Sequence, residues 1–515
     1  MKRYIVILMA LFVGTGLFAQ GEMDAIRLSN SDLRGTARGQ AMGGAFGALG
    51  GEVTGIMINP AGLGLYRSSE INFSVALNSF NLKTDWQNSI NQENKIKFNF
   101  DNISYVGYYP TGYIRFPALN FAFSYNRLKN FNRTYSASGA NMNTSLTDYL
   151  VAITNGIKQR DLYEEDYYDP YSNWQVPWLS VLGWQGCLID PVNDMDFNDA
   201  YKSILFPGEQ VAPRLEVNER GYIESYDFSL GGNFGNQLYL GLTLSLTDMF
   251  YHWNSSYGEE FGQREKIGLN NYLETEGSGY QAKFGAIWRP SDFLRLGAAY
   301  HSPTWYYLTD YYQGTTIAKY IGTDRERETP DGALTHYRFN TPGSWVFSVA
   351  GVMGSKAIVS LDYEFKDYRG MMLMDNEGMP KYDSNRFIEE DFKAASTLRA
   401  GLEYRFTPQF SGRLGYSYAQ NPYEKTFKDG GREVVIIGTI PHYTVEGDVN
   451  YLTAGIGYRF TPNFYIDAAL ICRTQNDALY YYPSILDGGE FIVKSIPASV
   501  TNRTYKGLVT VGCKF

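Results

Sequence analysis

The chain has 515 residues and a net charge of −9, and it is rich in Tyr (43), Phe (31) and Gly (53). The acidic balance and the lack of a Lys/Arg run exclude a nucleic-acid partner, because phosphate binding requires a basic patch. Beyond the N-terminus no stretch supplies the roughly 18 consecutive apolar residues of a membrane-spanning helix. The chain is therefore either an exported soluble protein or a membrane protein built from strands.

Residues 1–19 have the pattern of a secretory signal peptide. Lys2 and Arg3 precede an apolar run from Tyr4 to Val13, and small residues follow up to Ala19. The apolar run is too short to cross roughly 30 Å of hydrocarbon as a helix. We therefore expect cleavage after Ala19; an uncleaved anchor is the alternative interpretation.

Residues 20–69 contain many Gly and Ala residues and show no strand alternation. Gly39–Gly51 reads GQAMGGAFGALGG, and small residues of this kind allow close backbone packing. A dinucleotide-binding loop is excluded because no strand precedes these glycines. At the end of the segment, Asn59 followed by Pro60 predicts a rigid turn. We expect short helices and tight turns confined to a small space.

From Glu70 to the C-terminus, polar and apolar residues alternate with period two, which is typical of strands with two unlike faces. In one strand, Leu238, Leu240, Leu242, Leu244 and Leu246 share a face, opposite Tyr239, Gly241, Thr243, Ser245 and Thr247. Fourteen such strands are predicted, centred near Phe73, Val106, Phe121, Tyr226, Leu242, Phe284, Leu296, Phe347, Leu361, Ala400, Leu414, Ile456, Ala468 and Val509.

The connections between these strands are sorted by length. Short joints such as Gly235–Asn236 and Thr407–Gln409 alternate with long ones, the longest over about residues 130–220. Short turns on one side and long loops on the other are typical of bacterial outer-membrane barrels. A β-sandwich gives no such sorting. We therefore predict an all-β fold, an antiparallel transmembrane β-barrel of about 14 strands over residues 70–515.

One hairpin pattern occurs twice, first over residues 399–418 and again over 453–469, each with the letters YRFTP at its turn. In both copies a Leu/Ala/Ile/Tyr row is expected to face lipid. Arg399, Glu403 and Arg405 of the first copy then face the lumen, which requires a wet or plugged interior. The last strand ends in Phe515, an aromatic residue that resembles the recognition signal of the barrel-assembly machinery.

The stretch Ala37–Leu63, ARGQAMGGAFGALGGEVTGIMINPAGL, resembles the hatch of the FadL/TodX family of outer-membrane transporters for hydrophobic compounds. The motif residues are Asn59, Pro60, Ala61 and Gly62; where an acidic pair is common, this chain has Gly51 and Glu52. The resemblance implies that roughly residues 20–65 form a small helical hatch in the lumen of a barrel in the outer membrane of a Gram-negative bacterium. It also implies passive uptake of hydrophobic small molecules such as long-chain fatty acids, with outer-membrane lipids as neighbours.

The longest loop is rich in aromatic residues. Trp174, Trp178, Trp184 and Tyr171 are candidates for lining an apolar docking groove at the outer mouth, because aromatic side chains offer large contact areas. The alternative interpretation is that they pack the loop onto the barrel rim. A helical run is expected over residues 146–158.

The polar residues indicate no catalytic or metal site, and no cofactor is expected. Some members of the family are labelled haem receptors, and His301 is the first candidate for an axial ligand; a histidine with ordinary hydrogen bonds is the alternative. Asp362 and Glu364 share a face and are expected to pair with lumen arginines such as Arg399.

Two further functions remain open. Some relatives act as shuttles of a protein-secretion system, and long aromatic loops would serve a surface scaffold equally well. A lipid-hydrolysing barrel would need a Ser and a His brought together, and no motif indicates one. The chain is predicted not to be an enzyme.

Overall fold

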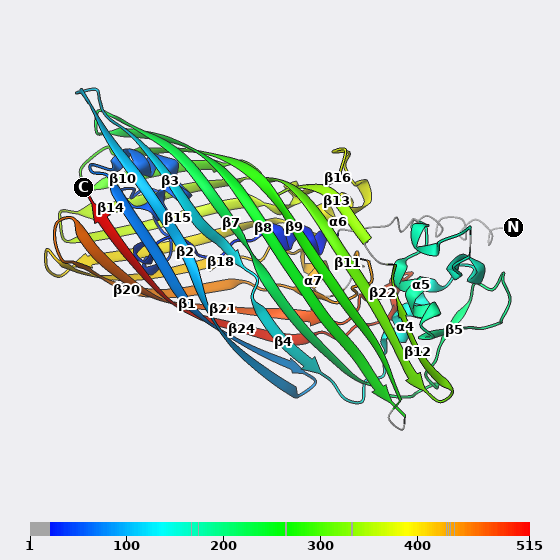
Figure 1. The fold of residues 1–515 in the computed structure, drawn as a ribbon. Helices are drawn as coiled ribbons and strands as arrows, with labels where there is room; N and C mark the ends of the chain where they lie inside the picture. The colour runs from blue at the N-terminus through cyan, green and yellow to red at the C-terminus, as the bar shows by residue number, and fades with distance from the viewer. Residues whose placement is uncertain are drawn as a thin grey trace.

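The computed structural model describes residues 21–165, 167–173, 175–262, 265–330, 333–428, 430, 432, 434–436 and 438–515. The predicted signal peptide lies outside the described residues. The remaining chain forms a closed antiparallel barrel of 14 strands (Figure 1). The first and last strands close it by pairing from Glu70 with Lys514 to Asp85 with Ser499. The predicted fold class is confirmed, and each of the fourteen predicted centres falls in a different wall strand.

Several wall strands are interrupted, so their parts carry separate labels. The wall consists of β1 (Glu70–Trp86), β2 (Ser89–Tyr113), β3 (Phe116–Asn130), β7 (Ala212–Phe234), β8 (Leu238–Phe261), β9 (Glu265–Trp288), β10 (Leu294–His301) continued by β11 (Trp305–Tyr320), β13 (Ala333–Asn340) continued by β14 (Ser344–Met353), β15 (Ala357–Asp367), β17 (Ala394–Arg405), β18 (Phe410–Ala419), β20 (Val449–Arg459), β21 (Phe464–Tyr480) and β24 (Ala498–Lys514).

The other elements are short and lie in the connections or inside the barrel. They are α1 (Glu22–Ser29), α2 (Ala37–Ala41), α3 (Val53–Ile58), η1 (Pro60–Leu65), β4 (Arg133–Ser138), α4 (Leu146–Thr154), η2 (Gln159–Leu162), η3 (Pro170–Ser172), α5 (Trp178–Gln185), β5 (Ile189–Pro191), β6 (Tyr201–Ser203), β12 (Thr323–Glu328), η4 (Tyr368–Gly370), β16 (Met372–Asp375), α6 (Tyr382–Asp391), α7 (Lys425–Lys428), β19 (Tyr443–Val445), β22 (Ile485–Asp487) and β23 (Glu490–Val493). Among the described residues, no helix has the length and apolar character needed to cross a membrane.

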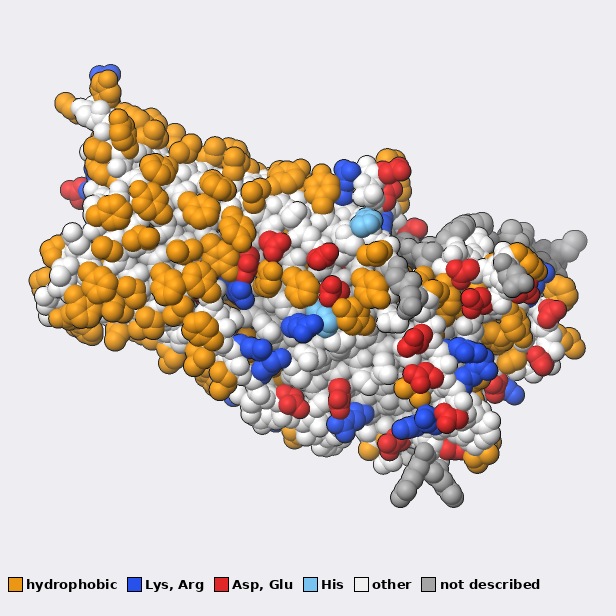
Figure 2. Space-filling view, in the orientation of Figure 1, with side chains coloured by type: hydrophobic (Ala, Val, Ile, Leu, Met, Phe, Trp, Pro, Cys, Tyr) orange, Lys and Arg blue, Asp and Glu red, His pale blue; other side chains and the backbone are white. Residues whose placement is uncertain are grey.

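The alternation of side chains places apolar residues on the outside of the wall. On β8, Leu240, Leu244 and Leu246 are exposed, whereas Thr243 and Ser245 between them are buried. Figure 2 shows these outward apolar side chains gathered into a broad band at the end of the barrel that carries the short turns. Such an arrangement is stable only where acyl chains cover the band, which is the environment of an outer-membrane barrel.

The predicted sorting of the connections is confirmed at the turns, which have two to five residues between paired strands on one side of the barrel. The opposite side differs from expectation. There β8 and β9 continue as paired strands over their full lengths, and β1 and β2 meet at a two-residue turn, Gln87 and Asn88. A strand needs only about 9–11 residues to cross the membrane. The remaining residues of these strands form a sheet outside the membrane. The outer face of that sheet is polar, so the sequence there shows no alternation of apolar and polar residues.

Residues 21–65 lie inside the barrel and carry α1, α2, α3 and η1 (Figure 1). Almost all of their apolar side chains are buried. Local hydrogen bonds define these short helices: the Thr36 side chain accepts from the Gly39 amide at the start of α2, and the Asn59 side chain accepts from the Ala61 amide at the start of η1. We refer to residues 21–65 as the luminal segment.

Candidate functional site

Asn59 of the predicted hatch motif fastens the luminal segment to the wall. Its Nδ2 donates to the carbonyl of Gly47 (2.7 Å) and to the carbonyl of Ala286 on β9 (3.1 Å), while its Oδ1 accepts from the Ala61 amide (3.1 Å). The side chain is buried, so these bonds are not exchanged with water. Pro60 then begins the 3₁₀ turn η1, where a missing N–H costs nothing.

Glycines on the inner wall make room for this segment. A Cβ on Gly285 would lie 1.9 Å from the Asn59 Oδ1, and one on Gly241 would lie 2.2 Å from the Pro60 carbonyl carbon. Further round the barrel, a Cβ on Gly415 would lie 2.1 Å from the Gly43 nitrogen. The wall glycines therefore permit backbone-to-backbone contact that no larger residue would allow.

An ion-pair network holds the other end of the luminal segment. Arg38 of α2 donates to Glu403 on β17 from Nε (2.8 Å) and Nη2 (3.0 Å). Arg413 on β18 also contacts Glu403 (2.7 Å) and reaches Asp467 on β21 (2.6 Å). The expectation that Glu403 faces the lumen is thereby confirmed. Arg399 likewise pairs with Glu364, as predicted, and Asp362 accepts from the Gly47 amide (2.9 Å).

Above the luminal segment lies a cavity of about 160 Å³. Its apolar side is formed by Met23 and Ile26 of α1, Trp253 of β8, and Ile436 and Ile440 of the segment between α7 and β19. These side chains are buried or nearly so. The cavity therefore offers a dry wall on which an acyl or aryl group can pack.

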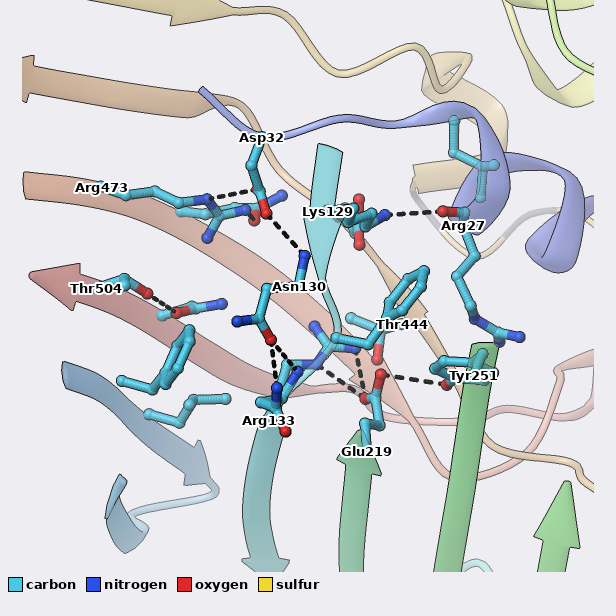
Figure 3. A pocket seen from close by; sticks show the side chains of 18 of the residues that line it. Arg27, Asp32, Lys129, Asn130, Arg133, Glu219, Tyr251, Thr444, Arg473 and Thr504 are labelled. Atoms are coloured by element: carbon cyan, nitrogen blue, oxygen red, sulfur yellow. Dashed lines mark hydrogen bonds and ion pairs between the residues drawn. The ribbon is translucent and has the colours of Figure 1, made fainter. Parts of the chain in front are cut away.

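The opposite side of the cavity carries cations on several strands (Figure 3). Arg133 pairs with Glu219 (2.7 Å), whereas Arg473 stands 3.9 Å from Asp32. Lys129 Nζ donates to the backbone carbonyl of Arg27 (2.8 Å). Glu446, which also lines the cavity, lies close enough to Lys129, Arg133 and Arg473 to balance part of their charge. Because Arg473 is only loosely paired with Asp32 and Lys129 donates to a neutral carbonyl, both can accept an additional anionic partner.

Two buried acids, Glu22 of α1 and Asp391 of α6, lie close together where these two helices meet. Glu22 is fully buried, and its Oε1 accepts from the Val435 amide (3.0 Å). Loss of hydration raises the pKa of Glu22 to about 8, and the nearby Asp391 of α6 adds to the increase. Burial likewise raises the pKa of Asp391 to about 7, against the opposing effect of Arg432. The contact between α1 and α6 thus contains protons that titrate near neutrality.

Beside the cavity, the hydrogen-bond ladder of the wall is interrupted. The β2–β3 pairing runs from Tyr113 with Phe116 only as far as Asn102 with Asn126, although both strands continue beyond that point. From there β2 keeps only its partner β1, and β3 keeps only its partner β7. We call this unpaired stretch, β2 residues 89–101 opposite β3 residues 127–130, the seam.

Two β-bulges produce the seam. The β1–β2 register shifts between Ser74 and Val75, which leaves Asp101 as the extra residue, and the β3–β7 register shifts between Arg127 and Lys129, which leaves Leu128. A bulge bends its strand and increases its twist, so two bulges at one level separate the strands. Both extra residues line the cavity. On the outer side, Phe100 and Tyr125 face each other across the seam with ring centroids 5.4 Å apart.

The predicted aromatic docking residues lie apart from this cavity, in the loop between β4 and β7. Tyr171 is buried, and Trp178 donates from Nε1 to its carbonyl (2.8 Å) and packs against Tyr312. Trp184 contacts Tyr163 edge to face. Trp174 lies outside the described residues. Trp178 thus packs the loop onto β11, while Tyr171 and Trp184 pack within the loop, and the part of all three in ligand docking remains a prediction.

His301 faces the lumen, as its position in the alternation indicates, and its Nε2 lies 2.8 Å from the Ile58 carbonyl while Nδ1 is 3.5 Å from the Ser344 hydroxyl. These contacts give it the hydrogen bonds of an ordinary buried histidine. Within the part of the chain that the structure describes, no group of three or more His, Cys, Asp or Glu side chains is arranged to hold a metal ion.

Sequence reasoning did not identify the cavity residues or the seam. One pattern could have indicated them: Lys129, Phe131, Arg133 and Tyr135 recur with period two, opposite in parity to the inward row that ends at Asn126. A change of parity within one strand is the mark of a bulge. The other cavity residues come from loops distant in the sequence, and no local pattern connects them.

Comparison with known proteins agrees with this geometry. A family profile described as "Outer membrane protein transport protein (OMPP1/FadL/TodX)" matches residues 254–479. The fold is similar to that of a Pseudomonas aeruginosa FadL homologue (13% identity, TM-score 0.52) and of the toluene transporter TodX of P. putida (14% identity, TM-score 0.51). In both cases the similarity covers 94% of this chain and 99% of the other. No curated protein sequence matches the chain.

The profile match covers the barrel from within β8 to β21, and the structural similarity extends over nearly the whole barrel. The predicted resemblance to this family and the predicted outer-membrane β-barrel are therefore confirmed. Residues 254–479 thus match the profile of the FadL/TodX family of outer-membrane transport proteins, and the whole barrel has a fold similar to that of the solved transporters.

Proposed function

We propose that the protein takes up hydrophobic molecules passively by binding them in the cavity above the luminal segment and releasing them sideways through the seam. The observation that carries this proposal is that the cavity and the interrupted ladder coincide: Asp101 and Leu128, the two bulged residues, belong to both. A molecule in the cavity is thus separated from the membrane by side chains and not by a hydrogen-bonded ladder.

A sideways exit suits an apolar ligand. Passage straight through the polar lower lumen would expose its hydrocarbon to water at about 25 cal/mol per Å². The route would also need the luminal segment to leave its seat, which Asn59 and the Arg38–Glu403 pair hold in place. We infer that the luminal segment, residues 20–69 in its predicted extent, acts as a hatch that blocks water and directs the ligand to the seam.

The substrate class we propose is an amphipathic acid such as a long-chain fatty acid. Met23, Ile26 and Ile440 provide the apolar wall for the chain, and Lys129 and Arg473 stand opposite to accept the carboxylate. A purely apolar ligand would displace the water around these cations without replacing its hydrogen bonds. The apolar and cationic sides together therefore favour a ligand with both characters.

The test is uptake of radiolabelled oleate by a deletion strain that is complemented with variants. Leu128→Trp places an indole in the cavity at the seam, and we expect it to abolish uptake. Leu119→Trp on the same strand faces lipid and serves as the matched control, with uptake retained. Normal uptake in the uncomplemented strain, or equal uptake by both variants, would contradict the proposal.

A second function has one observation in its favour. The loop between β4 and β7 has its own buried core, and Met195, Phe197 and Phe206 on its surface are more than two-thirds exposed. Exposed apolar side chains of this kind suit a protein partner, as a secretion shuttle would require. Normal oleate uptake combined with cargo proteins trapped in the periplasm of the deletion strain would support this function instead.

A further inference from the structure

The sheet formed by β7, β8 and β9 outside the membrane carries an outer surface that the transport route does not use. On β7 the outward residues run from Tyr226, Phe228 and Leu230 in the apolar band to Asn218. From Tyr226 to Asn218 the strand advances about 26 Å, or about 19 Å along the membrane normal for a tilt of about 45°. This surface therefore stands at the level of the lipid headgroups and the sugars beyond them.

The surface is polar and mostly uncharged, and it is hollowed. Asn218, Asn254, Ser256, Asn270, Tyr272 and Thr315 from four neighbouring strands line a groove of about 480 Å³. Figure 2 shows a largely white area beyond the apolar band, in contrast to the charged loops further out. Amide and hydroxyl groups that both donate and accept, with a tyrosine ring among them, are the groups that hydrogen-bond sugar hydroxyls and pack on sugar rings.

A cluster of cations lies between the apolar band and this groove. Lys95 of β2 is close to Lys97 and to Arg220 of β7, and its Nζ donates to Thr134, which lines the groove (3.1 Å). Arg220 and Lys97 are exposed. Among the residues that the structure describes, none of these three cations forms an ion pair with a carboxylate. Their uncompensated charge can bind a phosphate group.

The acidic residues of this face determine the side from which an anion can approach. Asp248 of β8 and Glu276 of β9 are exposed nearer the apolar band, and Glu274 contacts His252. Glu93 of β2 and Glu216 of β7 line the groove itself, so the unpaired positive charge lies with Lys95, Lys97 and Arg220 at its edge. An anionic group is expected to approach beside β2, with the groove open to whatever is attached to it.

We infer that this face binds lipopolysaccharide, with the cations Lys95, Lys97 and Arg220 on a phosphate and the groove on the core sugars. Along a single strand the surface changes from apolar to cationic to polar, and a lipopolysaccharide molecule presents acyl chains, phosphates and sugars in the same order. Lys95 and Lys97 lie on the β2 side of the seam, so the site adjoins the proposed exit, but none of its three cations lines the cavity.

The test uses the full-length protein in mild detergent and measures binding of rough lipopolysaccharide, which keeps its core sugars, and of lipid A, which lacks them. A triple variant, Lys95→Gln, Lys97→Gln and Arg220→Gln, is expected to bind both about 100-fold more weakly, since each cation near a lipid surface contributes roughly a factor of five. The matched control removes three exposed cations from the β11–β12 hairpin, Lys319, Arg325 and Arg327, and is expected to bind normally.

A second variant, with Asn218, Asn254 and Asn270 changed to Ala, separates the sugar contacts from the phosphate contacts. It is expected to lose affinity for rough lipopolysaccharide and to keep that for lipid A. Heat-dependent mobility on gels checks that each variant folds. Equal loss in the control variant, equal wild-type affinity for lipid A and rough lipopolysaccharide, or a loss of oleate binding in place of lipopolysaccharide binding would each overturn the inference.

Discussion

Replacing Asn59 with Ala is expected to loosen the luminal segment without disturbing the barrel. The change removes hydrogen bonds to the Gly47 and Ala286 carbonyls and one from the Ala61 amide, at 2.7, 3.1 and 3.1 Å. Of these bonds only the one to Ala286 joins the segment to the wall, and a buried bond contributes about 1 kcal/mol net, so the closed position loses about 1 kcal/mol. The population with an unseated segment should then rise by roughly fivefold, because about 1.4 kcal/mol corresponds to a factor of ten.

Single-channel conductance in planar bilayers detects this change, because an unseated segment opens the lumen to ions. The Asn59→Ala protein is expected to show frequent openings, while the wild-type protein stays closed. Asn94→Ala, on the exposed part of β2, is the control and should behave as wild type. If the Asn59→Ala protein were as closed as the wild type, the segment would be held by something other than this side chain, and the reasoning would be refuted.

Three further changes test other parts of the structure. Gly285→Ala places a Cβ 1.9 Å from the amide oxygen of the hatch asparagine and should also open the channel, whereas Gly507→Ala meets nothing within 4 Å and should not; equal conductance of the two would contradict the close fit. Burial raises the pKa of Asp391 from 3.8 in the unfolded chain to about 7 in the folded protein. Between pH 3.8 and pH 7 the folded protein therefore binds one proton that the unfolded chain does not. The stability that this proton adds is lost as the pH rises through about 7. Hydrogen exchange in α6, corrected for its intrinsic rate, should therefore be faster at pH 8.5 than at pH 5.5, and Asp391→Asn should remove the difference; the same difference in both proteins would exclude this residue as the cause. Leu242→Arg, at the middle of the lipid-facing row of β8, should lower the free energy of unfolding from vesicles by about 2–4 kcal/mol. Asn254→Arg beyond the membrane should leave it within about 0.5 kcal/mol, and similar losses for both would place the membrane boundary elsewhere.

The barrel could be predicted from the sequence because its determinants are local. Alternation over Leu238–Leu246 fixes which side of a strand faces lipid, and a short joint such as Gly235–Asn236 fixes which strands are paired. The same rule applied to each hairpin is sufficient to place fourteen strands. The motif at Asn59 was also visible, since an Asn-Pro turn after a glycine-rich run is a local feature.

The site could not be predicted in the same way, because its determinants are bulges and contacts between distant segments. A single extra residue, Leu128, changes which side of β3 faces inward, and nothing in its identity marks it as extra. Glu22 meets Val435 and Asp391 only in the folded chain. The prediction for the aromatic loop met a related difficulty. A tryptophan such as Trp178 is a residue type that often binds ligands, but here it packs against Tyr312, which is more than 100 positions away in the sequence.

The most direct test of the transport account is photo-crosslinking with an oleate analogue that carries a diazirine at the end of its chain. The protein is labelled in outer-membrane vesicles and the modified residues are identified by mass spectrometry. The account predicts crosslinks to cavity and seam residues, Leu128, Ile440 and Phe100 among them, and competition by unlabelled oleate. Crosslinks confined to the aromatic loop or the lower lumen, with none at the seam, would contradict it.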